Sequence, residues 1–225
     1  MSVGRIVAYG DFNCPWSYLA SRRTERLADD GVDVDWRAVE HEPPQPGSSV
    51  EQPSRLGDLV SEMDEVVAML LPGEQLPYAL AGFLPHTTAA VAGYAEAYGS
   101  GVSARVRKLL FEALWLHGFD LGDRSVVHTL LVDAVRSDSS FGKALPGWEY
   151  GGAAPDQPSS RARRLLTEWL HEWHDIGEKT VPVVVVDDAE VLRGKDAIAW
   201  LGAELQARGL QGAAGGSPAT ARAGR

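Results

Sequence analysis

The sequence predicts an α/β fold in which a block of helices separates two halves that contain strands. Three observations support this prediction. Residues 4–39 follow a strand–helix–strand pattern at the spacing of a βαβ unit, and residues 55–137 carry apolar side chains at helical spacing. Residues 181–207 then combine a run of valines, a turn, a short strand and a helix. The predicted order is thus a βαβ half, a helical block and a second β half.

The first half begins with an apolar strand over 4–9 and continues into a helix over 15–29. Pro15 suits the first position of this helix, because its fixed φ matches a helical turn and its missing N–H is not needed there. Gly31 follows as a typical helix C-cap. Residues 32–39 alternate apolar and polar side chains, which predicts the second strand.

The helical block is divided by turn-forming residues, mainly glycine and proline, that interrupt the apolar periodicity. These breaks leave four segments, each long enough for a helix of a globular protein. The predicted helices cover 55–70, 86–98, 102–117 and 123–137.

The second half follows a long loop rich in glycine and proline. This loop is expected over 141–158, and the apolar face of 159–176 then predicts a helix. Glycine, alanine, serine, proline and arginine dominate the end of the chain, so a disordered tail is predicted over 207–225. Between the helix at 159–176 and this tail, the sequence predicts a buried strand over 181–186, a hairpin turn at Asp187-Asp188, a partner strand over 191–192 and a helix over 195–207.

Composition and charge restrict the class of protein. The chain of 225 residues has 44% hydrophobic side chains, enough for a sizeable core. A formal net charge of −10 argues against nucleic acid or a membrane as the partner. Neither a signal peptide nor an apolar run of about 18 residues is found. With one cysteine the chain has no internal disulfide, so a cytoplasmic location is expected.

Cys14 is that one cysteine, and it lies in the motif Asp-Phe-Asn-Cys-Pro-Trp-Ser-Tyr between the first strand and the first helix. A sulfur at the first turn of a helix faces unpaired N–H groups and the positive end of the helix dipole, which favour the thiolate. Ser17 stands where a Cys-x-x-Cys redox motif has its second cysteine. The alternative interpretation is an inert cysteine that fills the core as a small apolar residue.

With this motif and these elements, the chain resembles the DsbA-like family of thioredoxin-fold oxidoreductases. The resemblance covers residues 4 to 206 and rests on the motif at 11–18 and on Thr-Val-Pro at 180–182. It implies a thioredoxin-like fold, with βαβ and ββα halves of the sheet and an inserted all-helical domain. It also implies that Pro182 follows a cis peptide bond and faces Cys14.

The same resemblance implies the domain boundaries. Residues 1–54 and 159–206 would form the thioredoxin-like domain, and 55–158 would form the helical insertion with its Gly/Pro-rich end. The groove between the two would hold the site. Its predicted substrate- or thiol-binding floor consists of Asn13, Pro15, Trp16, Val181 and Pro182 around Cys14 and Ser17.

The motif also resembles the branch of 2-hydroxychromene-2-carboxylate isomerases and kappa-class glutathione transferases. That pattern has a catalytic serine where this chain has Cys14, and Ser17 matches it. Gly194-Lys195-Asp196 resembles a Gly-x-Asp of this branch, in which Asp196 would meet the amino end of a thiol cofactor. Capping of a helix N-terminus is the alternative role for Asp196.

Three functions follow. The first is monothiol exchange, in which Cys14 forms a mixed disulfide and Ser17 holds the thiolate by a hydrogen bond. The second is isomerisation or transfer that depends on a glutathione-like thiol held near Cys14 or Ser17. The third is a peptide-binding module without catalysis. We expect no tightly bound cofactor, although glutathione or another low-molecular-weight thiol is the candidate co-reactant.

The expected partner is therefore a thiol or disulfide, either a small molecule or a protein, and a homodimer is compatible with the sequence. His171 and His174 lie three residues apart on a predicted helix, which is a spacing that could bind a metal. Because no third ligand is recognisable, we predict no metal site and assign these histidines to the polar side of an amphipathic helix.

Overall fold

The computed structural model describes residues 3–42, 53–79, 82–136, 158–177 and 179–210 of the chain. Within these ranges, a mixed sheet of four strands has the order β2-β1-β3-β4. β1 runs parallel to β2 and antiparallel to β3, and β3 runs antiparallel to β4. The strands are β1 (Arg5–Gly10), β2 (Asp33–Ala38), β3 (Val183–Val186) and β4 (Glu190–Arg193).

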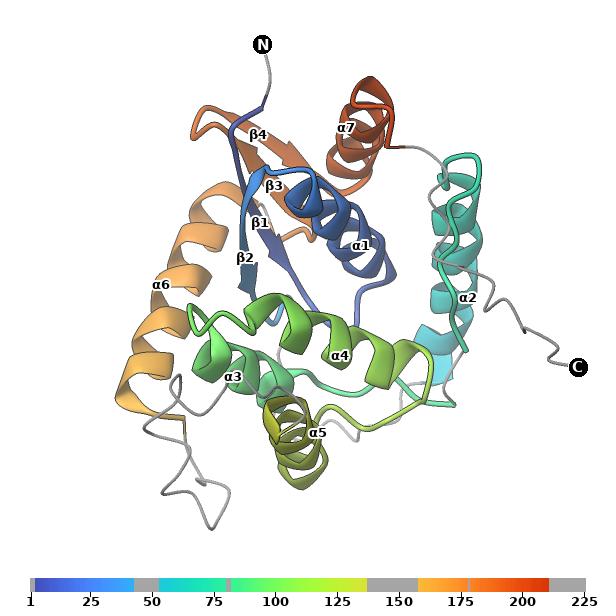
Figure 1. Cartoon of the computed structure of the whole chain (residues 1–225). Helices are drawn as coiled ribbons and strands as arrows, with labels where there is room; N and C mark the ends of the chain where they lie inside the picture. Colours follow the sequence, from blue (N-terminus) through green and yellow to red (C-terminus); the bar gives the residue numbers. More distant parts are fainter. Residues whose placement is uncertain (1–2, 43–52, 80–81, 137–157, 178, 211–225) are drawn as a thin grey trace, which may run out of the picture.

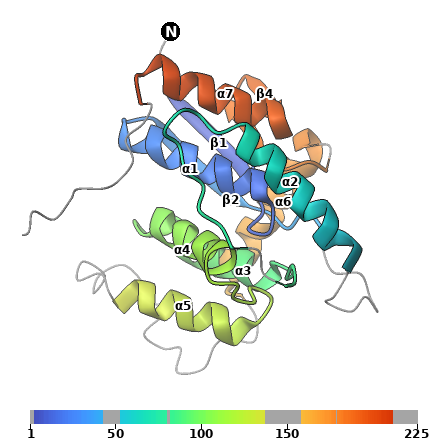
Figure 2. The same ribbon diagram turned by 90° about the vertical axis from the view of Figure 1, so that its right-hand side faces the viewer.

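Helices cover both faces of this sheet. α1 and α7 pack against each other on one face, and α6 covers the other face (Figure 1). α3, α4 and α5 pack together below the sheet, whereas α2 lies along α1 (Figure 2). The helices are α1 (Pro15–Asp29), α2 (Pro53–Ala68), α3 (Thr88–Ala97), α4 (Ser103–Trp115), α5 (Arg124–Arg136), α6 (Ser160–Gly177) and α7 (Gly194–Ala207).

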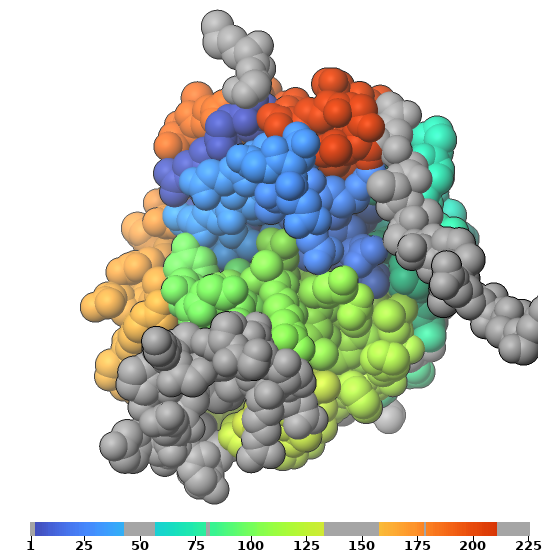
Figure 3. All heavy atoms as spheres, in the orientation of Figure 1, coloured from blue at the N-terminus to red at the C-terminus, as the bar shows by residue number. Residues whose placement is uncertain are grey.

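The surface follows this layering. Figure 3 shows α7, α1 and the helices of the middle of the chain as successive bands from top to bottom of one face. None of the described helices is long and apolar enough to cross a membrane.

The predicted elements are confirmed, with small shifts at their ends. Gly31 after α1 has a φ of 91°, as a C-cap glycine requires. Asp187 and Asp188 both have positive φ, the conformation of a tight hairpin turn that short polar side chains tolerate. β3 begins two residues later than predicted, because Val181 and Pro182 form a loop before it.

Two further predictions lie partly outside the described residues. These are most of the glycine- and proline-rich loop at 141–158 and most of the tail at 207–225. The domain boundaries remain a prediction. In the structure α2 packs on α1, and α3 packs on α6, so the buried core continues from the sheet into the helices.

Aromatic side chains fix the loop between β1 and α1 to α4. The Phe12 ring lies 4.9 Å from that of Phe111, and Tyr18 stacks on Phe111 and Trp115. The Trp115 indole N–H also donates to the Phe12 carbonyl at 2.9 Å. Aromatic pairs of this kind contribute about 0.5–1.5 kcal/mol each beyond the area they bury. Two aromatic residues of the motif are thus structural anchors on either side of Cys14.

Candidate functional site

Cys14 lies where β1 passes into α1. Its backbone is extended, and it occupies the N-cap position with Pro15 as the next residue. The Cys14 N–H donates to the Asp11 carbonyl at 3.2 Å, and the Cys14 carbonyl accepts the Tyr18 N–H at 3.0 Å. The sequence placed the sulfur at the first turn of a helix, and the structure confirms that position. The side chain is nevertheless only 6% exposed.

Ser17 holds the sulfur from the first turn of α1. Its side chain is fully buried, and both its backbone N–H and its hydroxyl hydrogen-bond the Cys14 sulfur. The Ser17 Oγ accepts the Asp11 N–H at 3.2 Å, so its own proton remains free to point at the sulfur. A Cβ at Gly10 would lie 3.1 Å from this Oγ and would overlap the Trp36 ring. The glycine at the end of β1 therefore allows this close approach.

The loop before β3 also contacts the sulfur. The Val181–Pro182 peptide bond is cis, as the family resemblance implies. Cys14 Sγ lies 3.8 Å from the Val181 carbonyl oxygen, a distance at which a protonated thiol can donate a weak hydrogen bond. The Pro182 carbonyl accepts the Gly194 N–H at 2.8 Å. This bond fixes the start of α7 to the loop that faces Cys14.

The electrostatic state of Cys14 differs from the expectation of a readily formed thiolate. Burial raises the pKa of the Cys14 thiol to about 12, and the negative charges of Asp11 and Glu62 add to this effect. The two hydrogen bonds from Ser17 lower the pKa but do not outweigh burial. Position at a helix N-terminus was visible in the sequence, whereas desolvation by the surrounding elements was not. The structure thus holds a protonated thiol at neutral pH.

Trp16 forms the rim of the site and is 8% exposed. The Lys195 Nζ lies 5.4 Å from the centroid of its ring, within the range of a cation–π contact. The same Nζ pairs with the Glu65 carboxylate at 2.9 Å, which connects the first turn of α7 to α2. Asp196 follows in the first turn of α7. The structure therefore brings Trp16 and the Gly-Lys-Asp segment to the same rim.

A cluster of acidic and hydroxyl side chains lies behind Cys14, and we refer to Asp11, Glu40, His41, Thr87 and Thr88 as the site cluster. The fully buried Asp11 carboxylate accepts the Thr87 hydroxyl at 2.5 Å and the His41 N–H at 2.9 Å. The His41 Nδ1 also lies 2.7 Å from it. Glu40 accepts the Thr88 hydroxyl at 2.9 Å. Burial raises the pKa of Glu40, opposed by its bond to Thr88.

Asn13, the residue before Cys14, is buried. Its Nδ2 donates to the Pro85 carbonyl at 3.1 Å, and its Oδ1 has no hydrogen-bond partner among the described residues. A buried acceptor without a partner costs about 1–3 kcal/mol. Asn13 was predicted as a binding residue, and the structure shows that its amide fixes the loop before α3.

Sequence reasoning overlooked several residues near the site. His41 and Glu65 received no role, and Lys195 was noticed only as the middle of a Gly-x-Asp pattern. The sequence explains Thr87 or Thr88 as the start of a helix, and in the structure Thr87 is the N-cap residue of α3. His171 pairs with Asp175 at 3.9 Å on the exposed side of α6. Within the described ranges, no group of three or more His, Cys, Asp or Glu side chains is arranged to hold a metal ion.

Comparison with known proteins places this geometry in context. The family model for the DSBA-like thioredoxin domain matches residues 5–206, which is nearly the whole chain. No curated protein sequence matches the chain.

Three solved structures share the fold. A 2-hydroxychromene-2-carboxylate isomerase is 18% identical with a TM-score of 0.58, and 92% of this chain and 97% of that one are covered. The cytosolic disulfide reductase DsbM from Pseudomonas aeruginosa, solved with GSH, is 16% identical with a TM-score of 0.59 and coverages of 90% and 99%. A probable DsbA oxidoreductase from Streptomyces coelicolor is 20% identical with a TM-score of 0.56 and coverages of 95% and 92%.

Proposed function

Because the chain belongs to the DSBA-like thioredoxin domain family, we propose that it is an enzyme of thiol–disulfide exchange that acts through a mixed disulfide at Cys14. One observation carries the proposal: the Cys14 sulfur contacts two hydrogen-bond donors of Ser17 and the carbonyl of the residue before a cis proline. This arrangement supports a reactive thiol. The loop would control how substrate reaches the sulfur, and the Ser17 donors would favour its ionisation. An inert core cysteine would need neither the donors nor the loop.

The reaction has two exchange steps. The Cys14 thiolate attacks one sulfur of a disulfide, so a Cys14–substrate disulfide forms and the other half leaves as a thiolate that takes up a proton. A second thiol then attacks the substrate sulfur of this mixed disulfide, which releases the new disulfide and restores Cys14. Ser17 cannot resolve the intermediate, because a hydroxyl is a poor nucleophile at neutral pH. The protein itself is neither oxidised nor reduced over the cycle.

The buried thiol defines the resting state of this cycle. With a pKa of about 12, very little Cys14 is ionised near neutral pH. Entry of substrate between α2 and the Val181–Pro182 loop would replace the contacts that bury the Cys14 thiol or expose the thiol to water. The donors of Ser17 and the N-terminus of α1 would then favour the thiolate that attacks. Control by access is therefore part of the proposed mechanism.

We propose a low-molecular-weight thiol, with glutathione as the first candidate, as the second reactant. DsbM of Pseudomonas aeruginosa is described as a cytosolic disulfide reductase and was solved with GSH, which supports the choice of probe. A cytoplasmic setting would supply such thiols, and the single cysteine is compatible with it.

The test is the intact mass of the native protein after incubation with oxidised glutathione, beside the variant Cys14→Ala. We expect one glutathionyl adduct, absent from the variant, that reduced glutathione removes. If the native protein gains no adduct while the urea-unfolded protein gains one, Cys14 is an inert core residue and the proposal is wrong.

A second candidate function uses the same site differently. Because the closed site keeps Cys14 protonated, its S–H and the Ser17 hydroxyl could both donate to the thiolate of a bound glutathione, as a thiol-dependent isomerase requires. Reduced glutathione bound in this way would show thiolate ultraviolet absorbance at pH 7 without any mass adduct. The absence of that absorbance would remove this candidate. Peptide binding that survives Cys14→Ala unchanged would instead favour a non-catalytic module.

A further inference from the structure

Lys195 is a cation at the rim of the site, and the Val181–Pro182 loop connects its segment to the Cys14 sulfur. The Val181 carbonyl lies at the Cys14 Sγ, and the next residue, Pro182, accepts the N–H of Gly194. Lys195 follows directly, and its Nζ lies over the Trp16 ring. The side chain is 59% exposed, so an incoming ligand can reach its ammonium group.

The charges that act on the sulfur are negative. Asp11 and Glu62 both raise the pKa of Cys14, Glu65 of α2 adds a carboxylate at Lys195, and Asp196 adds another in the first turn of α7. An anionic ligand would be repelled by these groups. Lys195 is the described cation that contacts the rim, and Glu65 already occupies it.

We propose that Lys195 binds a carboxylate of the thiol or disulfide that reacts at Cys14, and that Glu65 is an internal counter-ion which this carboxylate displaces. The proposal rests on the proposed function and specifies its substrate class: small disulfides that carry a free carboxylate close to the sulfur.

The strength of the Lys195–Glu65 pair suits such an exchange. Both side chains are at least half exposed, at 59% and 50%. Exposed ion pairs change an equilibrium by at most about fivefold, so this pair cannot lock the site. A ligand carboxylate can replace the Glu65 carboxylate with little net loss, because one charged hydrogen bond is exchanged for another. The pair therefore selects by charge without blocking entry.

The step at Cys14 is the exchange already described. The Cys14 thiolate breaks the disulfide of oxidised glutathione, one glutathionyl group stays on Cys14, and reduced glutathione leaves. Lys195 takes no part in bond formation. It is a specificity residue, and its effect should appear in the ratio of rates between anionic and neutral reagents.

The experiment compares two matched pairs of reagents on the full chain. Oxidised glutathione and bis(2-hydroxyethyl) disulfide report disulfide exchange, and iodoacetate and iodoacetamide report simple alkylation of Cys14. The variants are Lys195→Met, the charge-preserving Lys195→Arg, and Glu65→Gln. Lys108→Met is the control, because it removes the same charge from a pair with Glu25 on another surface.

We expect Lys195→Met to lower both anionic-to-neutral rate ratios by about two- to fivefold, the range of an exposed charge pair. Lys195→Arg should restore them, Glu65→Gln should raise them, and Lys108→Met should leave them unchanged. Equal changes with anionic and neutral reagents, or no change, would overturn the proposal.

The two reagent pairs separate this proposal from the proposed function. If no variant forms a disulfide adduct but Lys195→Met still lowers the iodoacetate-to-iodoacetamide ratio, the exchange reaction is wrong and the carboxylate site stands. If native Cys14 reacts with none of the four reagents, both are overturned.

Discussion

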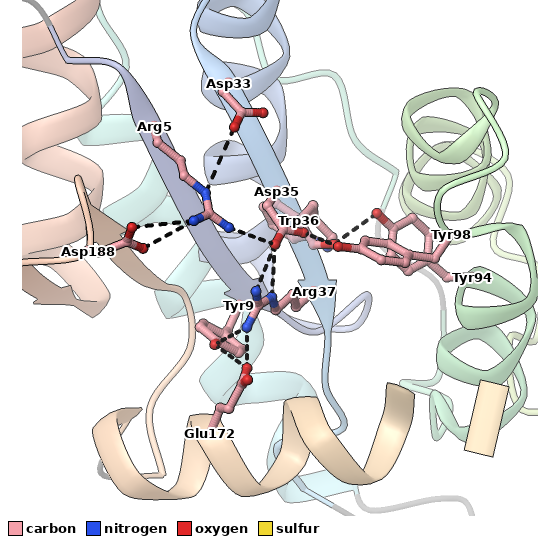
Figure 4. Close-up of polar contacts among 10 residues, drawn as sticks. All are labelled: Arg5, Tyr9, Asp33, Asp35, Trp36, Arg37, Tyr94, Tyr98, Glu172 and Asp188. Atoms are coloured by element: carbon pink, nitrogen blue, oxygen red, sulfur yellow. Dashed lines mark hydrogen bonds and ion pairs between the residues drawn. The ribbon is translucent and has the colours of Figure 1, made fainter. Parts of the chain in front are cut away.

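Two groups of polar side chains join helices to the sheet. They differ in the partners of their carboxylates, which are arginines in one group and mainly neutral hydrogen-bond donors in the other. The site cluster meets the start of α3 behind Cys14. The second group, which we name the sheet-face network, extends along the strands to Glu172 of α6 and consists of Arg5, Tyr9, Asp33, Asp35, Arg37, Tyr98, Glu172 and Asp188 (Figure 4).

Arginines hold the sheet-face network together. Arg37 forms two bonds to Asp35, at 3.0 and 2.8 Å, and also bonds Glu172 of α6. Arg5 pairs with Asp35 and Asp188 at 3.8 and 3.3 Å, and the Tyr98 hydroxyl donates to Asp35 at 2.6 Å. Because a guanidinium stays charged at every pH at which the protein folds, each of these carboxylates keeps a cationic partner.

The site cluster has hydroxyls, backbone N–H groups and one imidazole instead. His41 is its one side chain that can carry a positive charge, and the cluster contains no arginine or lysine. The negative charge of Asp11 raises the pKa of Cys14. Fixed positive charges thus make a structural joint, whereas neutral donors leave a carboxylate whose charge acts on the reactive sulfur.

The largest expected effect is the loss of stability in Arg37→Met. The variant leaves the largely buried Asp35, the buried Tyr9 and the exposed Glu172 without their shared donor, which should lower the free energy of unfolding by about 2–3 kcal/mol. Urea denaturation measures this loss. Arg5→Met is the control, because its side chain is 42% exposed and should cost under about 1 kcal/mol. Equal losses in both variants would contradict a joint centred on Arg37.

The raised pKa of Cys14 predicts that the free energy of unfolding changes with pH. The folded pKa of about 12 lies above the unfolded value of about 8.5, so the thiol favours folding below pH 8.5 and this contribution is lost as the pH rises toward 12. The stability of the native protein relative to Cys14→Ser should therefore fall by about 1 kcal/mol between pH 8 and pH 9.5. Urea denaturation at the two pH values measures the difference. A constant difference would mean that the thiol is not desolvated.

The sequence was sufficient for the features that lie close together along the chain. Cys14, Pro15 and Ser17 were found because one motif contains them, and the Asp187-Asp188 turn because its residue types tolerate positive φ. The cis bond before Pro182 came from the family resemblance.

The partners of these residues could not be found in the same way. His41, Thr87 and Lys195 reach the site from three distant segments, and each is unremarkable in its own segment. The pKa of Cys14 depends on how completely the packed fold excludes water from the thiol, and the local sequence pattern carries no information on that. The position of Cys14 was predictable because a local motif determines it. Its pKa was not predictable, since the pKa depends on how distant segments pack around the thiol.

The smallest expected effect tests whether the charge of Asp11 acts on Cys14. Asp11→Asn keeps one acceptor oxygen but removes the charge that raises the pKa of Cys14. Alkylation by iodoacetamide at pH 7 should therefore become about two- to fivefold faster, since a lower pKa increases the thiolate fraction.

Loss of stability could also accelerate alkylation, and Thr87→Val separates the two causes. This variant removes the 2.5 Å bond to Asp11 and weakens the same joint, yet it leaves the Asp11 charge less compensated. Its Cys14 pKa should rise further, so alkylation should become slower although the protein is less stable. Opposite changes in the two variants would establish control by charge. If both variants react faster in proportion to their loss of stability, opening of the fold governs Cys14, and the site cluster is a structural joint like the sheet-face network.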